Sequence, residues 1–207
     1  MRRYWLRILV YIGAVLPLVW LIWSYSQNNL TVNPVKEIQL LTGKYAIILF
    51  VLTLAATPLS RLFRSRQLLQ VRRPLGLFTF LYVCLHFLNF LVLDYGFDFG
   101  LIREDLFEKP FAVVGFASFL LLLPLAVTST RRWMVRLGKN WKRLHWLVFP
   151  AMLLALVHFF WQEKAEIREP LVYTLVVLLF VLMRAPVMKK LTARLNQQPA
   201  EDTDPGY

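Results

Sequence analysis

The sequence predicts an all-α integral membrane protein, a bundle of six transmembrane helices, and three observations lead to this fold class. First, 58% of the 207 residues are hydrophobic and 17% are charged, whereas soluble proteins average about 45–50% apolar and about 25% charged residues. Second, six apolar runs approach the length that a helix needs to cross a hydrocarbon core about 30 Å thick. Third, basic residues gather in alternate loops. These runs leave no room for a separate soluble domain.

The six predicted spans are, in chain order, residues 8–26, 45–60, 75–93, 111–130, 144–161 and 170–187. The first follows the basic segment "MRRYWLR", but its apolar core is too long for a signal peptide and no small-residue cleavage site follows. The second is short and must borrow flanking residues or snorkelling side chains. Residues 1–194 are therefore predicted to form one transmembrane domain, and the polar residues 195–207 a disordered cytoplasmic tail.

The loop before the second run predicts a further, separate element. The segment "NPVKEIQLLTG", residues 33–43, starts with an Asn-Pro turn signal, and its apolar residues recur at helical spacing. We expect a short helix at the membrane surface, either without a partner or as a docking site for one. If the helix docks a partner, reversing the charges of Lys36 and Glu37 should weaken the interaction with that partner. If the helix has no partner, the reversal should change nothing.

The positive charges predict the orientation of the bundle. Of the 24 Lys and Arg residues, 18 lie before the first run, in the second and fourth loops, or beyond residue 183, where the apolar core of the last run ends. Under the positive-inside rule this alternation places both termini in the cytoplasm. We interpret the net charge of +12 mainly as a topology signal, and tryptophans at the ends of the runs as interfacial anchors. Nucleic-acid binding is not indicated, although part of the charge could serve to dock an acidic partner.

All three histidines lie in or at the edge of apolar runs: His86, His145 and His158. The apolar cores of the runs, the last taken as residues 171–183, contain no Asp, Glu, Lys or Arg. A proton-coupled transporter or an ion pathway normally carries such groups within the membrane. The sequence therefore favours a role that rests on the imidazoles themselves.

His86 and His158 are predicted to lie at similar depth on parallel helices. With a helical rise of 1.5 Å per residue, His86 lies about 17 Å from Leu75 and His158 about 21 Å from Leu144. We interpret them as the axial iron ligands of a haem b held between facing helices. Zinc is less favoured, because it takes about four protein ligands in a structural site. The alternative is a membrane anchor or transporter without haem, whose histidines make interhelical hydrogen bonds worth about 1 kcal/mol.

His145 lies at the inner end of the same predicted span, about 20 Å from His158 along an unbroken helix. We expect it to bind an inner-leaflet haem, a flavin or a quinone, with Arg72 and Arg73, just before the third span, at the matching depth. Thirteen residues turn an ideal helix by about 220°, so a kink at Pro150 would be needed to alter the phase of the two imidazoles. The alternative is an interfacial polar residue beside Trp146.

Four segments closely resemble the MsrQ family, also called YedZ, and the likeness extends to about residue 194. They are "NPVKEIQLLTGKYAIILFVLTLAATPLSR" (33–61), "RRPLGLFTFLYVCLHF" (72–87), "FLLLLPLAVTST" (119–130) and "LGKNWKRLHWLVF" (137–149). That family is the haem-binding membrane subunit of the MsrPQ protein-methionine-sulfoxide reductase system. It is related to the ferric reductase-like transmembrane domain, whose fold the resemblance implies here.

The resemblance implies a non-catalytic electron-transfer subunit in the bacterial inner membrane. Electrons would pass from the quinone pool or a cytosolic flavin reductase, through haem b, to the periplasmic molybdenum-containing reductase MsrP, which repairs oxidised periplasmic proteins. FMN is implied by the resemblance only, and no motif in the sequence places it. Related oxidases carry two histidines in their third helix and this chain carries one, so the number of haems, one or two, stays open.

Overall fold

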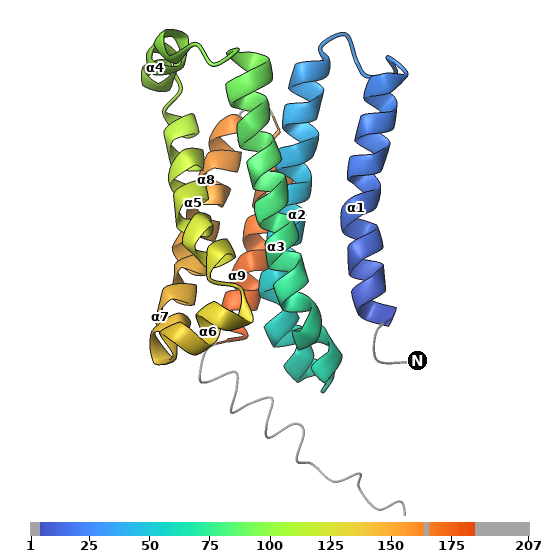
Figure 1. Ribbon diagram of the computed structural model, residues 1–207, viewed down its shortest axis with the longest axis vertical. Helices are drawn as coiled ribbons and strands as arrows, with labels where there is room; N and C mark the ends of the chain where they lie inside the picture. Colours follow the sequence, from blue (N-terminus) through green and yellow to red (C-terminus); the bar gives the residue numbers. More distant parts are fainter. Residues whose placement is uncertain (1–4, 164–165, 185–207) are drawn as a thin grey trace, which may run out of the picture.

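The computed structural model describes residues 5–163 and 166–184, and every regular element in these residues is helical (Figure 1). The predicted all-α fold is therefore confirmed for the described residues, and the predicted tail, residues 195–207, lies outside them. The elements are α1 (Trp5–Ser26), α2 (Pro34–Leu62), α3 (Arg66–Leu88), the π-helical segment η1 (Asn89–Asp94), α4 (Phe99–Glu108), α5 (Pro110–Val127), α6 (Arg131–Leu137), α7 (Lys139–Leu144), the 3-10 turn η2 (His145–Leu147), α8 (Val148–Gln162) and α9 (Arg168–Leu182).

Five segments are long and apolar enough to cross a membrane: residues 5–26, 34–62, 66–94, 110–127 and 139–162. They correspond to the first five predicted spans, so the chain is a multi-pass membrane protein by the length and composition of its helices. The sixth predicted span corresponds to α9, which has 15 helical residues in the described part of the chain. Because the predicted span runs on to residue 187, beyond the described residues, the count of six stays a prediction.

The largest error in the predicted boundaries concerns α2. This helix begins at Pro34 and is continuous to Leu62, so the separate surface helix expected at residues 33–43 is wrong. Those residues form the first turns of α2. The turn signal itself is where the helix starts: Asn33 Oδ1 accepts a hydrogen bond from the Lys36 backbone N–H at 3.0 Å, and Pro34 occupies the first turn, where its missing N–H costs nothing.

The helices pack around α2, which contributes to both hydrophobic clusters of the described core. One cluster joins α2 to α5, α8 and α9, with Phe50, Leu54 and Met152 almost fully buried. The other joins α2 to α1 and α3, with Tyr82 donating a hydrogen bond to the Ala14 carbonyl at 2.8 Å. α1 lies at one edge of the bundle (Figure 1), and most of its apolar side chains are exposed, as expected for a helix that faces lipid.

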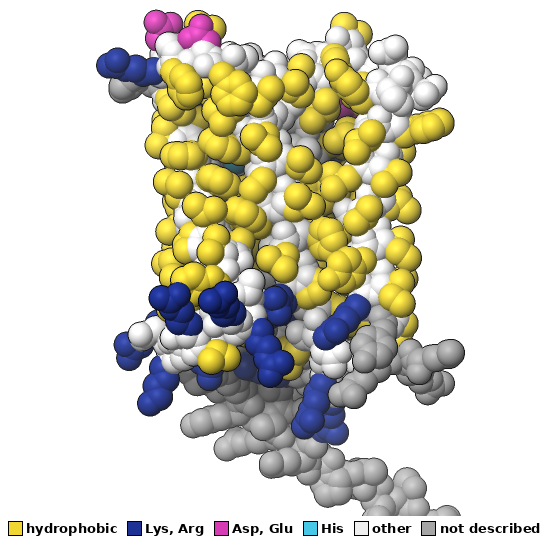
Figure 2. Space-filling view, in the orientation of Figure 1, with side chains coloured by type: hydrophobic (Ala, Val, Ile, Leu, Met, Phe, Trp, Pro, Cys, Tyr) yellow, Lys and Arg dark blue, Asp and Glu magenta, His cyan; other side chains and the backbone are white. Residues whose placement is uncertain are grey.

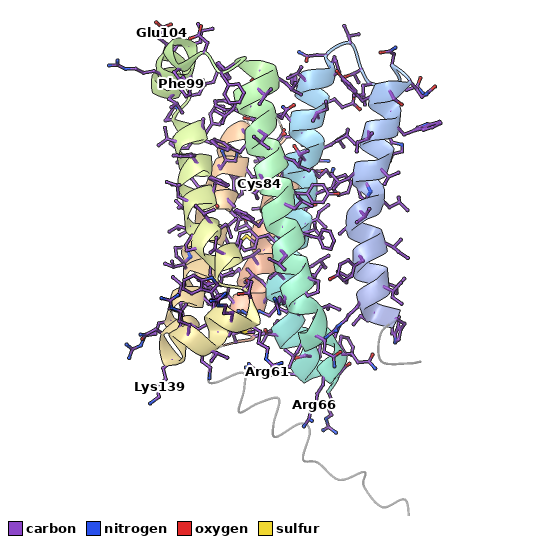
Figure 3. The ribbon with its side chains drawn as sticks, viewed as in Figure 1. Arg61, Arg66, Cys84, Phe99, Glu104 and Lys139 are labelled. Atoms are coloured by element: carbon purple, nitrogen blue, oxygen red, sulfur yellow. The ribbon has the colours of Figure 1, made fainter. Side chains whose placement is uncertain are left out.

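The two ends of the bundle differ in charge (Figure 2). Lys and Arg side chains gather at the end that holds Arg61, Arg66 and Lys139, which we call the basic end (Figure 3). Glu104 of α4 lies at the opposite end, which we call the acidic end (Figure 3). The space between them is covered by apolar side chains (Figure 2). This arrangement is the one that the positive-inside rule requires if the basic end faces the cytoplasm.

Candidate functional site

His86 of α3 and His158 of α8 face one another in the half of the bundle nearer the acidic end. Their ring centroids are 6.1 Å apart and the ring planes are nearly perpendicular, at 84°. Both side chains are half-buried. The structure therefore brings together the two histidines that the sequence places at similar depth, although 71 residues separate them in the chain.

Each of these imidazoles is held through Nδ1 by a backbone carbonyl of a neighbouring helix. His158 Nδ1 lies 2.7 Å from the Phe111 carbonyl oxygen of α5, and His86 Nδ1 lies 3.0 Å from the Gln39 carbonyl oxygen of α2. A carbonyl only accepts hydrogen bonds, so Nδ1 carries the proton in both rings. The second nitrogen, Nε2, is then left with its lone pair, which is the form in which histidine binds metals.

The distance between the rings fits two axial ligands on one metal ion. Bonds of about 2 Å from each Nε2 to a shared metal would put the two nitrogens about 4 Å apart and the ring centroids about 6 Å apart. Within the described residues no group of three or more His, Cys, Asp or Glu side chains could hold a metal ion. A metal bound here would therefore take its remaining ligands from a cofactor, as an iron porphyrin provides.

Two linked amides, Gln39 and Asn89, lie beside His86, and sequence reasoning missed both of them. Gln39 Nε2 lies 3.2 Å from His86 Nε2, and Asn89 Nδ2 donates to Gln39 Oε1 and, at 3.2 Å, to the Val35 carbonyl. Asn89 is buried, and its Oδ1 has no hydrogen-bond partner among the described residues. It begins the π-helical segment η1, and such segments are frequent at functional sites. A polar residue within a predicted span was the signal that could have found it.

His145 lies nearer the basic end, and its surroundings differ from those of the other two histidines. Its Nδ1 donates to the carbonyl of Trp141, one turn earlier in its own chain segment, at 3.1 Å. Its ring stacks on the Trp141 indole at 3.9 Å, and Trp141 Nε1 donates to the Thr128 carbonyl at 2.9 Å. The indole is thus fixed to the end of α5, and the imidazole is fixed to the indole.

The helical segment that carries His145 and His158, residues 139–162, changes type near its inner end. Residues 145–147 form the 3-10 turn η2, and α8 begins at Val148. Pro150 has no backbone N–H to donate to the carbonyl four residues earlier, at Trp146, so the regular hydrogen-bond ladder is interrupted at this point. The kink expected at Pro150 stays a prediction, and the structure shows a change of helix type over residues 145–147.

The arginines at the basic end differ in their relation to His145. Arg72 is half-buried and its charge acts on His145, whereas Arg73 is exposed. Arg184 and Arg61, which sequence reasoning did not select, join Arg72 in one cluster of positive charge. Arg184 Nη2 donates to the Leu54 carbonyl at 2.6 Å and its guanidinium lies over the Phe149 ring. A basic residue inside the last predicted span was the signal for Arg184.

Comparisons with known proteins show which family the sequence matches. The family described as "Ferric reductase like transmembrane component" matches residues 42–156. A relative from Xanthomonas axonopodis pv. citri (strain 306), named "Protein-methionine-sulfoxide reductase heme-binding subunit MsrQ", is 42% identical over 192 residues, which are 90% of this chain and 87% of the relative. A relative of the same name from Xanthomonas campestris pv. campestris (strain B100) is 43% identical over 178 residues, which are 84% of this chain and 81% of the relative.

Proposed function

The chain belongs to the MsrQ family of haem-binding subunits of protein-methionine-sulfoxide reductases, and from this premise we propose how it transfers electrons. It takes electrons from the quinone pool or a cytosolic flavin reductase at the basic end, in the cytoplasm. It delivers them at the acidic end to a periplasmic molybdenum-containing methionine sulfoxide reductase, MsrP. The membrane is the bacterial inner membrane, and the reaction served is the repair of oxidised periplasmic proteins.

The observation that carries this proposal is the pair of facing imidazoles, His86 and His158. A haem b bound between them would supply a one-electron redox couple within the membrane. The protein would hold the iron through the two Nε2 atoms, and the Nδ1 hydrogen bonds to the carbonyls of Gln39 and Phe111 would fix the tautomer and orientation of each ring. The Gln39 amide would give up its contact with His86 Nε2 when a metal takes that position.

The basic end supports entry of electrons there. His145 presents Nε2 on a ring whose other nitrogen is already bonded, and Arg72, Arg61 and Arg184 provide positive charge nearby. Guanidinium groups bind carboxylates and phosphates by charge-assisted, often bidentate hydrogen bonds. The ligand of this inner site is accordingly a second haem, FMN or a quinone, each of which carries or develops negative charge.

A membrane anchor that only docks a periplasmic enzyme is the competing function, and it makes the histidines dispensable. Both histidines do make the interhelical hydrogen bonds that this function predicts, but those bonds do not require the two imidazoles to face each other about 6 Å apart. A transporter is disfavoured because the apolar cores of the predicted spans hold no acidic or basic side chain.

The visible spectrum of the full chain, purified from membranes of cells supplied with a haem precursor, tests the proposal. We expect a Soret band and, after reduction, the sharp α and β bands of a low-spin b haem. Reoxidation of this haem on adding the periplasmic reductase with a methionine sulfoxide substrate would establish the direction of transfer. A colourless preparation, or a haem that the reductase does not oxidise, would contradict the proposal.

A further inference from the structure

Both halves of the His86–His158 pair share one local arrangement that the proposed function does not explain. On α2, the carbonyl that holds His86 belongs to Gln39, and a glycine, Gly43, follows four residues later. On α5, the carbonyl that holds His158 belongs to Phe111, and Gly115 follows four residues later. Residues four apart lie on the same helix face. Each imidazole therefore lies over a glycine and bonds to the carbonyl one turn before it.

The contacts at these glycines leave no room for a side chain. A Cβ at position 115 would lie 2.8 Å from His158 Nδ1 and 2.9 Å from its Cε1, closer than real Cβ contacts. A Cβ at position 43 would lie 3.1 Å from His86 Cε1 and 3.2 Å from its Nδ1, so that ring would have to shift by a few tenths of an ångström.

Two other glycines, in the long helices α1 and α3, have no histidine against them and leave room for a Cβ. A Cβ at Gly76 of α3 would meet Thr53 at an ordinary 3.6 Å, and one at Gly13 of α1 would meet nothing within 4 Å. Gly76 is thus a natural comparison, since it packs between α2 and α3, the helix pair that also holds His86.

We propose that Gly43 and Gly115 are positioning residues for the two axial histidines. A glycine lets the imidazole lie against the backbone of the neighbouring helix, where Nδ1 reaches the carbonyl, and Nε2 then points away from that helix. The helix pairs α2/α3 and α5/α8 are in this way two half-sites, each presenting one oriented imidazole. This inference rests on the proposed function, because the orientation matters only if the rings bind one cofactor.

The competing explanation is that these glycines serve only to let helices approach, as small residues do in many membrane proteins. That explanation predicts lower stability of the G115A and G43A variants with unchanged ligand geometry. Positioning predicts a change at the iron: a rotated ring or a lost Nδ1 hydrogen bond alters the low-spin electron paramagnetic resonance spectrum, whose g values depend on the angle between imidazole planes. It also weakens the retention of haem.

The test compares G115A, G43A and the control G76A in the full chain, loaded with haem in cells and purified. The measurements are the electron paramagnetic resonance spectrum of the oxidised protein and the rate at which haem transfers to excess apomyoglobin. We expect G115A to shift the g values and to release haem at least about 10-fold faster, the range in which loss of a ligand's supporting hydrogen bond acts. G43A should change both in the same direction but less, and G76A should match the wild type.

If G115A does not accumulate, G43A decides alone, because its required shift is small. Wild-type g values and release rates in G43A, or in G115A, would overturn the positioning role while leaving the haem proposal intact. Equal changes in G76A would also overturn it, since that variant adds a methyl group between α2 and α3 without touching a histidine. A wild-type protein that holds no haem would overturn this inference and the proposed function together.

Discussion

The outer site, His86 with His158, and the inner site, His145 with Arg72, are built on different plans from the same residue type. In the outer site the carbonyls that hold the rings come from neighbouring helices, and two imidazoles face each other. In the inner site the carbonyl comes from the preceding turn of the same segment, and one imidazole stacks on Trp141. The outer site thus brings two imidazoles together, whereas the inner site has one.

The two sites also differ in the charge of the side chains around them. Neutral amides, Gln39 and Asn89, lie on the His86 side of the outer pair, and three arginines, Arg61, Arg72 and Arg184, form a cluster on the side of His145. A site without charge suits a cofactor that is held by its metal, and a site with clustered guanidinium groups suits one that is held by its anionic groups. Depth in the membrane accounts for this difference. Charge is costly near the bilayer centre, so a site there binds its cofactor through the metal, and arginines can serve only closer to the surface.

The largest expected effect comes from removing either ligand of the outer pair. H86A and H158A should each lose most of the haem, because one imidazole and an apolar wall hold the iron less well than two imidazoles do. Haem per protein is measured as the pyridine haemochrome, with folding followed by size-exclusion chromatography. If both alanine variants kept full haem content and an unchanged spectrum, His86 and His158 would not be the iron ligands, and the outer site would not differ from the inner one in this way.

A smaller effect, confined to the inner site, is expected from H145A. The outer haem should stay bound with its spectrum unchanged, and its reduction by a donor at the basic end should slow about 10-fold, as for other losses of cofactor-orienting groups. Stopped-flow absorbance of the haem, with reduced flavin as donor, gives the rate. Reduction at the wild-type rate would take His145 off the path of electrons.

The arginines offer a matched pair that sharpens this result. R72Q removes a half-buried charge that acts on His145, and R73Q removes an exposed one next to it. If the inner site binds FMN, R72Q should weaken it about 10-fold, the loss expected for one charge-assisted hydrogen bond, while R73Q should change it little. Fluorescence titration with FMN measures both. Equal weakening in the two variants would indicate a diffuse field and no defined inner site.

The smallest effect is expected at the acidic end. Lys36 is exposed on the first turn of α2, whereas Glu37 already accepts a hydrogen bond from the Thr31 backbone N–H at 2.6 Å. K36E should therefore slow haem oxidation by the periplasmic reductase a few-fold, about what a rim charge contributes to association, and leave haem content unchanged. An unaltered rate would favour the reading in which this surface has no partner.

The sequence allowed prediction of the helical fold, the first five spans and the meeting of His86 with His158, because apolar length and helical rise determine depth in a membrane. It did not allow prediction of where α2 begins, since Lys36, Glu37 and Lys44 interrupt the apolar pattern of a helix that continues past the membrane surface. Gln39, Gly43 and Gly115 were missed because their roles depend on which helix lies opposite. The rotation of a helix about its axis is fixed by packing, which a single sequence does not encode locally.

Pulsed electron paramagnetic resonance on the H145A variant, prepared with ¹⁵N-labelled histidine, shows whether His86 and His158 bind the same iron. With His145 removed, the two remaining histidines are His86 and His158. We expect two strongly coupled ¹⁵N nuclei, one from each histidine, on one oxidised low-spin iron. Coupling to a single histidine nitrogen, or no iron signal in a folded protein, would contradict it.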